Sequence, residues 1–300
     1  MPPADSAYEQ LCAHARETSL LKSTAGLLQW DEETYLPPAG GAYRAEQMAY
    51  LAGLIHQRET DPRVGEWLDA LGDAADDGSD GDTEPTAVVR GLRRDYEKKT
   101  RLPQALVEEL TRTASLGQQA WKEARKADDF ARFQPLLEKT IQLKRQEADA
   151  YGYVQSRYDA LLDDYEPGET AANVTRVLKG LREQLTPLVE KIAASDRRPA
   201  VDLVDRRYPR AAQEAFGKRA ATAIGFDFDA GRLDVTAHPF CGGAGPRDVR
   251  LTTRYDEADF AGGFFSILHE AGHGIYEQGL PPDQFGLPTG EATSLGIHES

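Results

Sequence analysis

The sequence predicts a mainly α-helical protein with a small β-sheet near its C-terminal end. Apolar residues recur at helical spacing up to about residue 223, and beyond residue 224 short alternating runs rich in Val and Thr replace that pattern. With 300 residues, 40% of them hydrophobic and 28% charged, the chain can bury a sizeable core. We expect a single domain over residues 1–300, comprising a helical region to about 223, a sheet over about 224–255 and a helix over about 257–278.

Proline and glycine divide the helical region. The run YLPPAGG at 35–41 separates the first helix from the second, in which Met48, Leu51, Leu54 and Ile55 form an apolar stripe. Proline is tolerated in the first turn of a helix, so Pro103 and Pro135 are expected at helix starts. The further helices that this periodicity predicts lie near 86–100, 103–126, 130–158, 170–194 and 209–223.

Charge and composition exclude several classes of protein. The net charge of -15 disfavours binding to nucleic acid or to an anionic membrane surface. Residues 72–85 carry six acidic residues and no basic one, but they lack the closing Glu of an EF-hand, so we expect a solvated loop. Two cysteines, Cys12 and Cys241, make no disulfide framework, and neither a signal peptide nor a membrane span is visible. A cytoplasmic protein is the expectation.

The C-terminal third predicts two strands followed by a helix. Residues 225–240 and 246–256 alternate apolar and polar side chains, and the intervening CGGAGP has the composition of a turn. The helix that follows is expected from about Glu257 to Gln278, with Asp256 as its N-cap. Gly279, Pro281 and Pro282 should end it.

This last helix carries the motif H-E-x-x-H. His269 and His273 are four residues apart, which places both imidazoles on one helix face, about 6 Å apart, where both can bind one Zn²⁺. Glu270 lies close enough to hold an activated water as general base. The alternative is a surface helix with two histidines facing solvent.

A catalytic zinc site needs a third protein ligand. Tyr276 and Gly279 stand where the metzincin motif would require Gly and His, and Glu277 follows on the same helix and cannot easily close around the metal. Glu291 and Glu299 are the candidates from a second segment, and spacing alone does not choose between them.

Several motifs in order resemble the carboxypeptidase Taq family of metallocarboxypeptidases. The matching runs are QWDEETYLPPAG at 29–40 followed by Arg44, YDALLDDYEPG at 158–168, HPF at 238–240, DVRLTTRY at 248–255, HEAGHGIYEQGL at 269–280 and GIHES at 296–300. The resemblance implies a mostly helical fold with a deep groove, and removal of C-terminal amino acids from peptides with broad preference. It also implies zinc or sometimes cobalt as the metal, and a homodimer.

Carried over residue by residue, the resemblance makes His269, His273 and Glu299 the metal ligands and Glu270 the catalytic base. A carboxylate on a helix that begins near Thr293 can face the zinc helix across a turn, which is compatible with this assignment.

The Asp-x-Arg-x-Thr motif of that family falls on Asp248, Arg250 and Thr252. Alternation along a strand puts the three side chains on one face, and the resemblance makes that face a wall of the substrate groove held by an Asp–Arg interaction. The alternative is an ordinary strand with a polar face in solvent. His238 either points into the groove or is a hydrogen-bonded histidine at a strand end.

Other residues near these motifs are assigned to structure. Trp30 is expected in the core and Asp31 at a backbone turn, whereas His14 and His56 lack a partner at ligand spacing.

The chain departs from the family in length. Members run some two hundred residues longer, so the chain is expected to correspond to the N-terminal three-fifths of such a protein. No arginine is assigned to the substrate carboxylate, a role that a carboxypeptidase requires. The competing hypothesis is a catalytically inert helical fragment or interaction module that retains the zinc helix.

Overall fold

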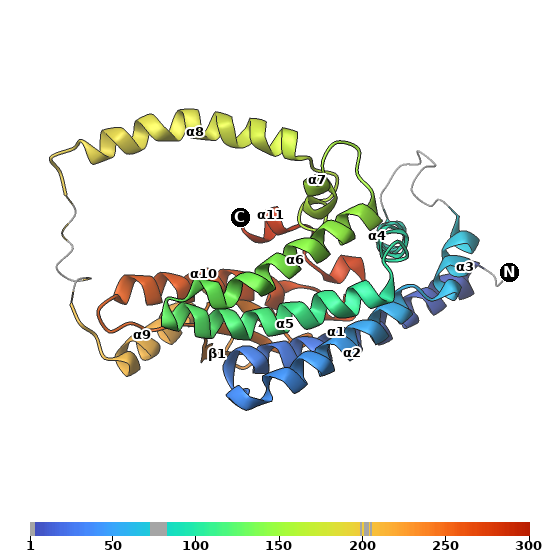
Figure 1. Cartoon of the computed structure of the whole chain (residues 1–300), viewed down its shortest axis with the longest axis horizontal. Coiled ribbons are helices and arrows are strands. Elements are labelled where there is room, and N and C mark those ends of the chain that lie inside the picture. Colours follow the sequence, from blue (N-terminus) through green and yellow to red (C-terminus); the bar gives the residue numbers. More distant parts are fainter. Residues whose placement is uncertain (1–3, 73–82, 199, 201–203, 205) are drawn as a thin grey trace.

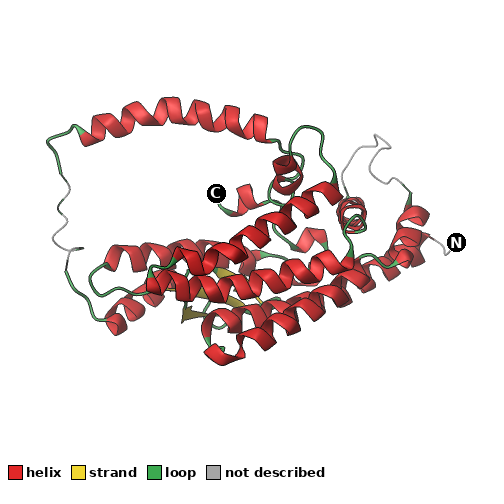
Figure 2. Cartoon of the chain, viewed as in Figure 1, coloured by secondary structure: helices red, strands yellow, loops and turns green. Residues whose placement is uncertain are grey.

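The computed structural model of the chain describes residues 4–72, 83–198, 200, 204 and 206–300. These residues form a mainly helical body with a small sheet, as predicted (Figures 1 and 2). The acidic run falls mostly on residues 73–82, outside the described residues. The described α-helices are α1 (Ala4–Thr34), α2 (Gly41–Glu59), α3 (Pro62–Leu71), α4 (Glu84–Lys99), α5 (Gln104–Ala127), α6 (Phe130–Tyr151), α7 (Arg157–Leu162), α8 (Ala171–Ala193), α9 (Arg210–Ile224), α10 (Phe260–Gly279) and α11 (Leu295–His298).

The predicted helices are confirmed to within a few residues, with two corrections. Pro135 lies inside α6 and not at its start, because Asp129 caps this helix by accepting a hydrogen bond from the Arg132 amide. The same helix ends at Tyr151, where Gly152 takes a positive φ of 79°. The helix α3 was not predicted, although its start has a clear signal in the Asp61 cap followed by Pro62.

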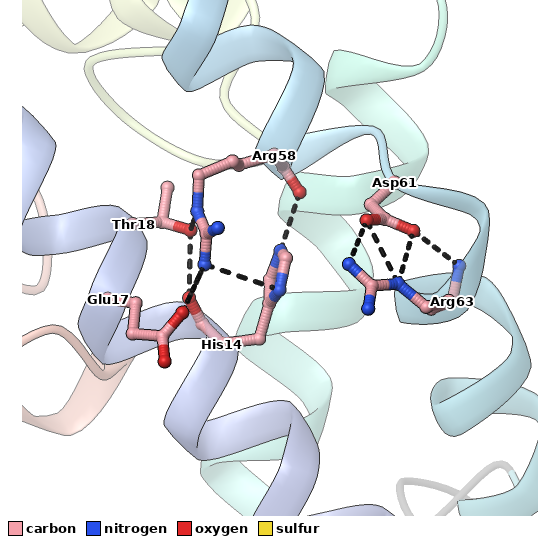
Figure 3. A network of polar contacts seen from close by, with 6 residues as sticks. All are labelled: His14, Glu17, Thr18, Arg58, Asp61 and Arg63. Atoms are coloured by element: carbon pink, nitrogen blue, oxygen red, sulfur yellow. Dashed lines mark hydrogen bonds and ion pairs between the residues drawn. The ribbon is translucent and has the colours of Figure 1, made fainter.

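A polar network joins α1 to α2, and beside it Asp61 and Arg63 form a separate ion pair at the start of α3 (Figure 3). The Arg58 guanidinium donates to Glu17 at 2.8 Å and to the Thr18 hydroxyl at 3.1 Å. The Nε2 of His14 lies 2.8 Å from the carbonyl of Arg58, to which it donates. His56 binds the Leu102 carbonyl in the same way, so both histidines have the structural surroundings that we expected.

The sheet within the described residues has three strands in the order β1-β3-β2. β1 (Gly231–Val235) runs parallel to β3 (Val249–Thr253), and β2 (Cys241–Gly243) runs antiparallel to it. The expectation of a turn over CGGAGP was therefore wrong for its first three residues, because the edge of β3 offers them a hydrogen-bonding partner. The tight turn follows at residues 244–248, where the Ala244 amide donates to the Asp248 carbonyl.

Helix α10 packs against this sheet and against α9. Their shared core consists of Ala221, Phe226, Val249, Leu251, Ile267 and Ala271. The N-cap of α10 is Asp259, which accepts from the Gly262 amide at 2.8 Å, and not the predicted Asp256, which caps a turn at Ala258. The helix ends at Gly279, one residue beyond the expected end.

Helix α8 packs less closely on the rest of the described chain than the other long helices do. None of its residues is buried against the described part of the chain, and Figure 1 shows it clear of α6 and α10. None of the helices that the structure describes is long and apolar enough to cross a membrane. A single domain over residues 1–300 stays a prediction.

Candidate metal centre

A cleft of about 1010 Å³ opens beside α10. α10 forms one side of it, and α11 together with the segment 238–241 borders it as well. The predicted site residues that line this cleft are His238, His269, Glu270, His273 and Glu299. The cleft corresponds to the groove that the resemblance implies.

Three predicted ligands converge at the cleft. The Nε2 atoms of His269 and His273 are 3.2 Å apart, and the Oε2 of Glu299 lies 3.7 Å from the first and 3.6 Å from the second. Atoms bound to zinc at about 2.0–2.1 Å with tetrahedral angles are roughly 3.3 Å from one another. The three side chains therefore fit a divalent metal with an open fourth position. They form the group with metal-binding geometry among the residues that the structure describes.

The helical spacing and the second helix explain this convergence. His269 and His273 occupy successive turns of α10, and Ser294 caps the short helix α11. That helix begins at Leu295, two residues later than expected, and Glu299 is its C-cap. Glu299 and His269 are half-exposed, with side-chain exposures of 49% and 57%, whereas His273 is 10% exposed. The site is therefore open on one side.

Burial shifts the pKa of two groups of the site, the ligand His273 and its neighbour Glu270. The pKa of Glu270 is raised to about 7, mainly by burial; His269 opposes the shift and the nearby Glu299 carboxylate adds to it. Burial also lowers the pKa of His273, and the neighbouring His298 acts in the same direction. Neutral imidazole is the form that binds a metal. A carboxylate that titrates near neutrality is suited to take up and release a proton.

The structure separates the two candidate third ligands. Glu299 joins the histidines, whereas Glu291 lies near Lys22 and Asp95 and is not part of that group. Burial raises the pKa of Glu291. Glu277 is not part of the ligand group either, and its carboxylate lies 3.8 Å from the Nδ1 of His298.

His298 is a residue of this site that the sequence did not single out. Its ring stacks on that of His273 at a centroid distance of 4.5 Å and an interplanar angle of 6°, and Tyr276 contacts its face edge-on at 5.0 Å. The signal in the sequence was its position directly before Glu299 in the run GIHES. Stacking of this kind fixes the orientation of the His273 ring.

The Asp-x-Arg-x-Thr residues lie behind the cleft and not in its lining. Arg250 donates to both carboxylate oxygens of Asp248 at 2.8 Å, so the expected Asp–Arg interaction is present. Its guanidinium also lies over the buried Trp30 ring, 4.2 Å from the centroid. Thr252 is fully buried and bonds both backbone groups of Phe240. These three residues therefore do not form the wall of the cleft that we expected. The segment 238–241 lines the cleft instead, and Thr252 holds that segment in place.

Two arginines to which the sequence analysis gave no role border the cleft. Arg125 at the end of α5 lies over the Trp121 ring at 5.2 Å, and Arg254 follows β3. The Cys241 thiol lines the cleft too, and burial raises its pKa to about 12 with a contribution from Glu270. A thiol with such a pKa stays protonated and is a poor nucleophile.

Comparison with known proteins finds similarity to carboxypeptidases of one metallopeptidase family. The family profile of carboxypeptidase Taq (M32) metallopeptidases matches residues 10–300. Thermostable carboxypeptidase 1 of Thermus thermophilus is 42% identical over 312 residues, which cover 99% of this chain and 60% of that protein. The crystal structure named BsuCP has a TM-score of 0.91 at 33% identity, covering 98% of this chain and 58% of that one. The M32 carboxypeptidase from Deinococcus radiodurans R1 has a TM-score of 0.81 at 39% identity, with the same coverage. The chain thus spans about three fifths of the length of these relatives.

Proposed function

Because the chain belongs to the carboxypeptidase Taq (M32) family of metallopeptidases, we propose that it carries the metal-binding and proton-transfer half of a carboxypeptidase site. The observation that supports this most directly is the convergence of two imidazoles and one carboxylate, with ligand atoms 3.2–3.7 Å apart, beside a buried glutamate. The substrates in this proposal are peptides, from which C-terminal amino acids are released with broad preference.

We assign the metal to zinc, with cobalt as the substitute. His269, His273 and Glu299 would hold it, and their nitrogen and oxygen donors suit zinc. A bound zinc would polarise the scissile carbonyl and lower the pKa of the attacking water. Glu270 takes the proton of that water and delivers it to the leaving amine, for which a pKa of about 7 is favourable.

The remaining predicted residues take supporting roles in this proposal. His238 faces the substrate in the cleft. Thr252 positions Phe240, and the Asp248–Arg250 pair holds β3 against Trp30. A cytoplasmic location and a homodimer belong to the proposal too; both cysteines are free, as a reducing compartment requires.

Metal content separates the roles of the site residues. Purified Glu270→Gln should keep about one zinc per chain, because Glu270 is not a ligand, whereas His273→Ala should lose it. Elemental analysis after dialysis measures both. Loss of zinc from Glu270→Gln, or its retention in His273→Ala, would contradict the ligand set.

Peptide cleavage then tests the activity. A peptide blocked at its N-terminus should release C-terminal residues, and the same peptide with an amidated C-terminus should not, because the free carboxylate is the recognised charge. Mass spectrometry of both digests gives the answer, for this chain and for a version extended by the remainder of a relative. Equal cleavage of both peptides would refute the exopeptidase assignment. Zinc binding with no cleavage by either version would support the competing hypothesis of an inert helical module.

A further inference from the structure

Glu277 continues the line of the two imidazole ligands along α10. It follows His273 by four residues, just as His273 follows His269, so the three side chains lie on successive turns of one side of the helix. Its carboxylate is not part of the ligand group, and its side chain is 34% exposed. One carboxylate oxygen lies 3.8 Å from the Nδ1 of His298. Glu277 therefore faces the short helix α11, at whose end the third ligand lies.

His298 contacts both Glu277 and the ligand His273. Its ring is stacked on that of His273 with the two planes 6° apart, and Tyr276 lies edge-on against it. The Nδ1 of His298 is buried, and no described residue forms a hydrogen bond with it. Leaving a buried N–H unpaired costs free energy, so a protonated Nδ1 favours the Glu277 carboxylate as its acceptor.

Glu299 needs support from outside the ligand group. It is the C-cap of α11, a helix of four residues, and its side chain is 49% exposed. A half-exposed carboxylate at the end of so short a helix has several conformations open to it, and ordering it costs conformational entropy. His298, the residue directly before it, packs on α10. The position of His298 therefore sets where the Glu299 carboxylate can reach.

We propose that Glu277 is a positioning residue of the metal centre, which holds Glu299 in place through His298. By accepting from Nδ1, Glu277 fixes the rotation of the His298 ring, and that ring joins the end of α11 to the His273 imidazole. One contact outside the ligand group thus aligns the ligands of two helices. Removing a group that orients metal ligands weakens metal binding about 10- to 100-fold. The inference rests on the proposed metal centre, and its test separates the two.

The test is the zinc affinity of the 300-residue chain, measured by competition with a chelator of known affinity. Glu277→Leu removes the acceptor with little change in side-chain size, so it should weaken zinc binding about tenfold or more. Glu277→Gln should recover part of the loss, because its amide oxygen can still accept from Nδ1. The matched control is Glu291→Leu, which removes the same charge from another glutamate outside the ligand group and should bind zinc as wild type does. Equal zinc affinity of Glu277→Leu and wild type would overturn the inference, as would an equal loss in both leucine variants.

Two further measurements separate positioning from a general effect on the fold. His298→Phe keeps a stacking ring but has no Nδ1, so it should weaken zinc binding as Glu277→Leu does, and it provides the test if Glu277→Leu does not fold. The visible absorption of the cobalt-loaded protein should become weaker in both variants, because water replaces a loosely held Glu299 and raises the coordination number. An unchanged cobalt spectrum, together with a lower melting temperature in chelator, would assign Glu277 to the fold alone and overturn the inference. A wild-type chain that binds no zinc would refute the proposed metal centre itself, and with it this role of Glu277.

Discussion

Gly272 and Gly274 flank His273 on α10, yet their surroundings are opposite. A Cβ added at Gly274 would lie 2.6 Å from the Phe226 ring and 2.9 Å from Leu251, two side chains of the core between α10 and the sheet. A Cβ at Gly272 would meet nothing within 4 Å. The glycine at 274 therefore sets how closely the metal-binding helix can approach the sheet, and the one at 272 does not.

Alanine at these two positions should change stability in opposite directions. Gly274→Ala should lower the free energy of unfolding by about 1–3 kcal/mol, because the buried ring and Leu251 must shift. Gly272→Ala should raise it by up to about 1 kcal/mol through helix propensity alone. Urea unfolding followed by circular dichroism measures both. Equal effects of the two substitutions would mean that the contact with Phe226 is not limiting.

The residues of the metal centre differ in how far the sequence could predict them. The spacing of His269 and His273 is a property of one helix, so local sequence predicts their common face. The choice of Glu299 over Glu291 depends on where the chain turns after α10, which the residues alone left open. The stacking of His298 on His273 joins two helices and has no periodic signal.

Asp163 joins the end of α7 to α4. Its carboxylate accepts hydrogen bonds from Lys98 and Arg94, both at 2.7 Å, and from the Gly168 amide at 2.9 Å. Gly168 takes a φ of 78°, which a side chain disfavours. This cluster holds the segment that leads into α8.

The stability that Asp163 contributes should depend on pH. Burial alone would raise its pKa, but the hydrogen bonds from Lys98 and the Gly168 amide outweigh burial and lower the pKa to about 2. A lowered carboxyl pKa contributes stability above the unfolded value of about 4, and this contribution is lost as the pH falls towards 2. Asp163→Asn should therefore cost about 1 kcal/mol between pH 5 and 7, after allowance for solvent screening, and less below pH 4. Urea midpoints at pH 7, 5 and 3.5 measure this, and a constant difference at all three would contradict the assignment.

The helices were predictable because apolar periodicity and caps are local. The sheet was predictable only in part, because β2 is a glycine-rich run that becomes a strand through the edge of β3, a partner eight residues away that no local signal marks. Pro135 shows the reverse error. Proline favours a helix start in general, but the Asp129 cap decides the boundary of α6.

The metal centre would connect two parts of the molecule, α10 and α11, that few other contacts join. Two ligands belong to α10, which packs on the sheet, and the third follows α11, a helix of four residues. In the described structure α11 is held by hydrogen bonds to Tyr165 and Glu166 and by the stacking of His298. A bound metal adds a direct link from Glu299 to α10, so it should stabilise the folded chain.

Zinc should therefore raise the melting temperature of the 300-residue chain, whether or not that chain is an active peptidase. At a free zinc concentration one hundred times Kd, binding to the native state alone contributes about 2.7 kcal/mol, or roughly 5 °C for a chain of this size. His269→Ala should abolish the shift, because it removes one of the three ligands. His238→Ala removes an imidazole from the same cleft that lies outside the ligand group, and should keep the shift. Thermal unfolding of the three proteins, with zinc and with a chelator, makes the comparison. An equal zinc-dependent shift in all three would place the bound ion elsewhere in the molecule, since only a site built on α10 and Glu299 requires the His269 imidazole.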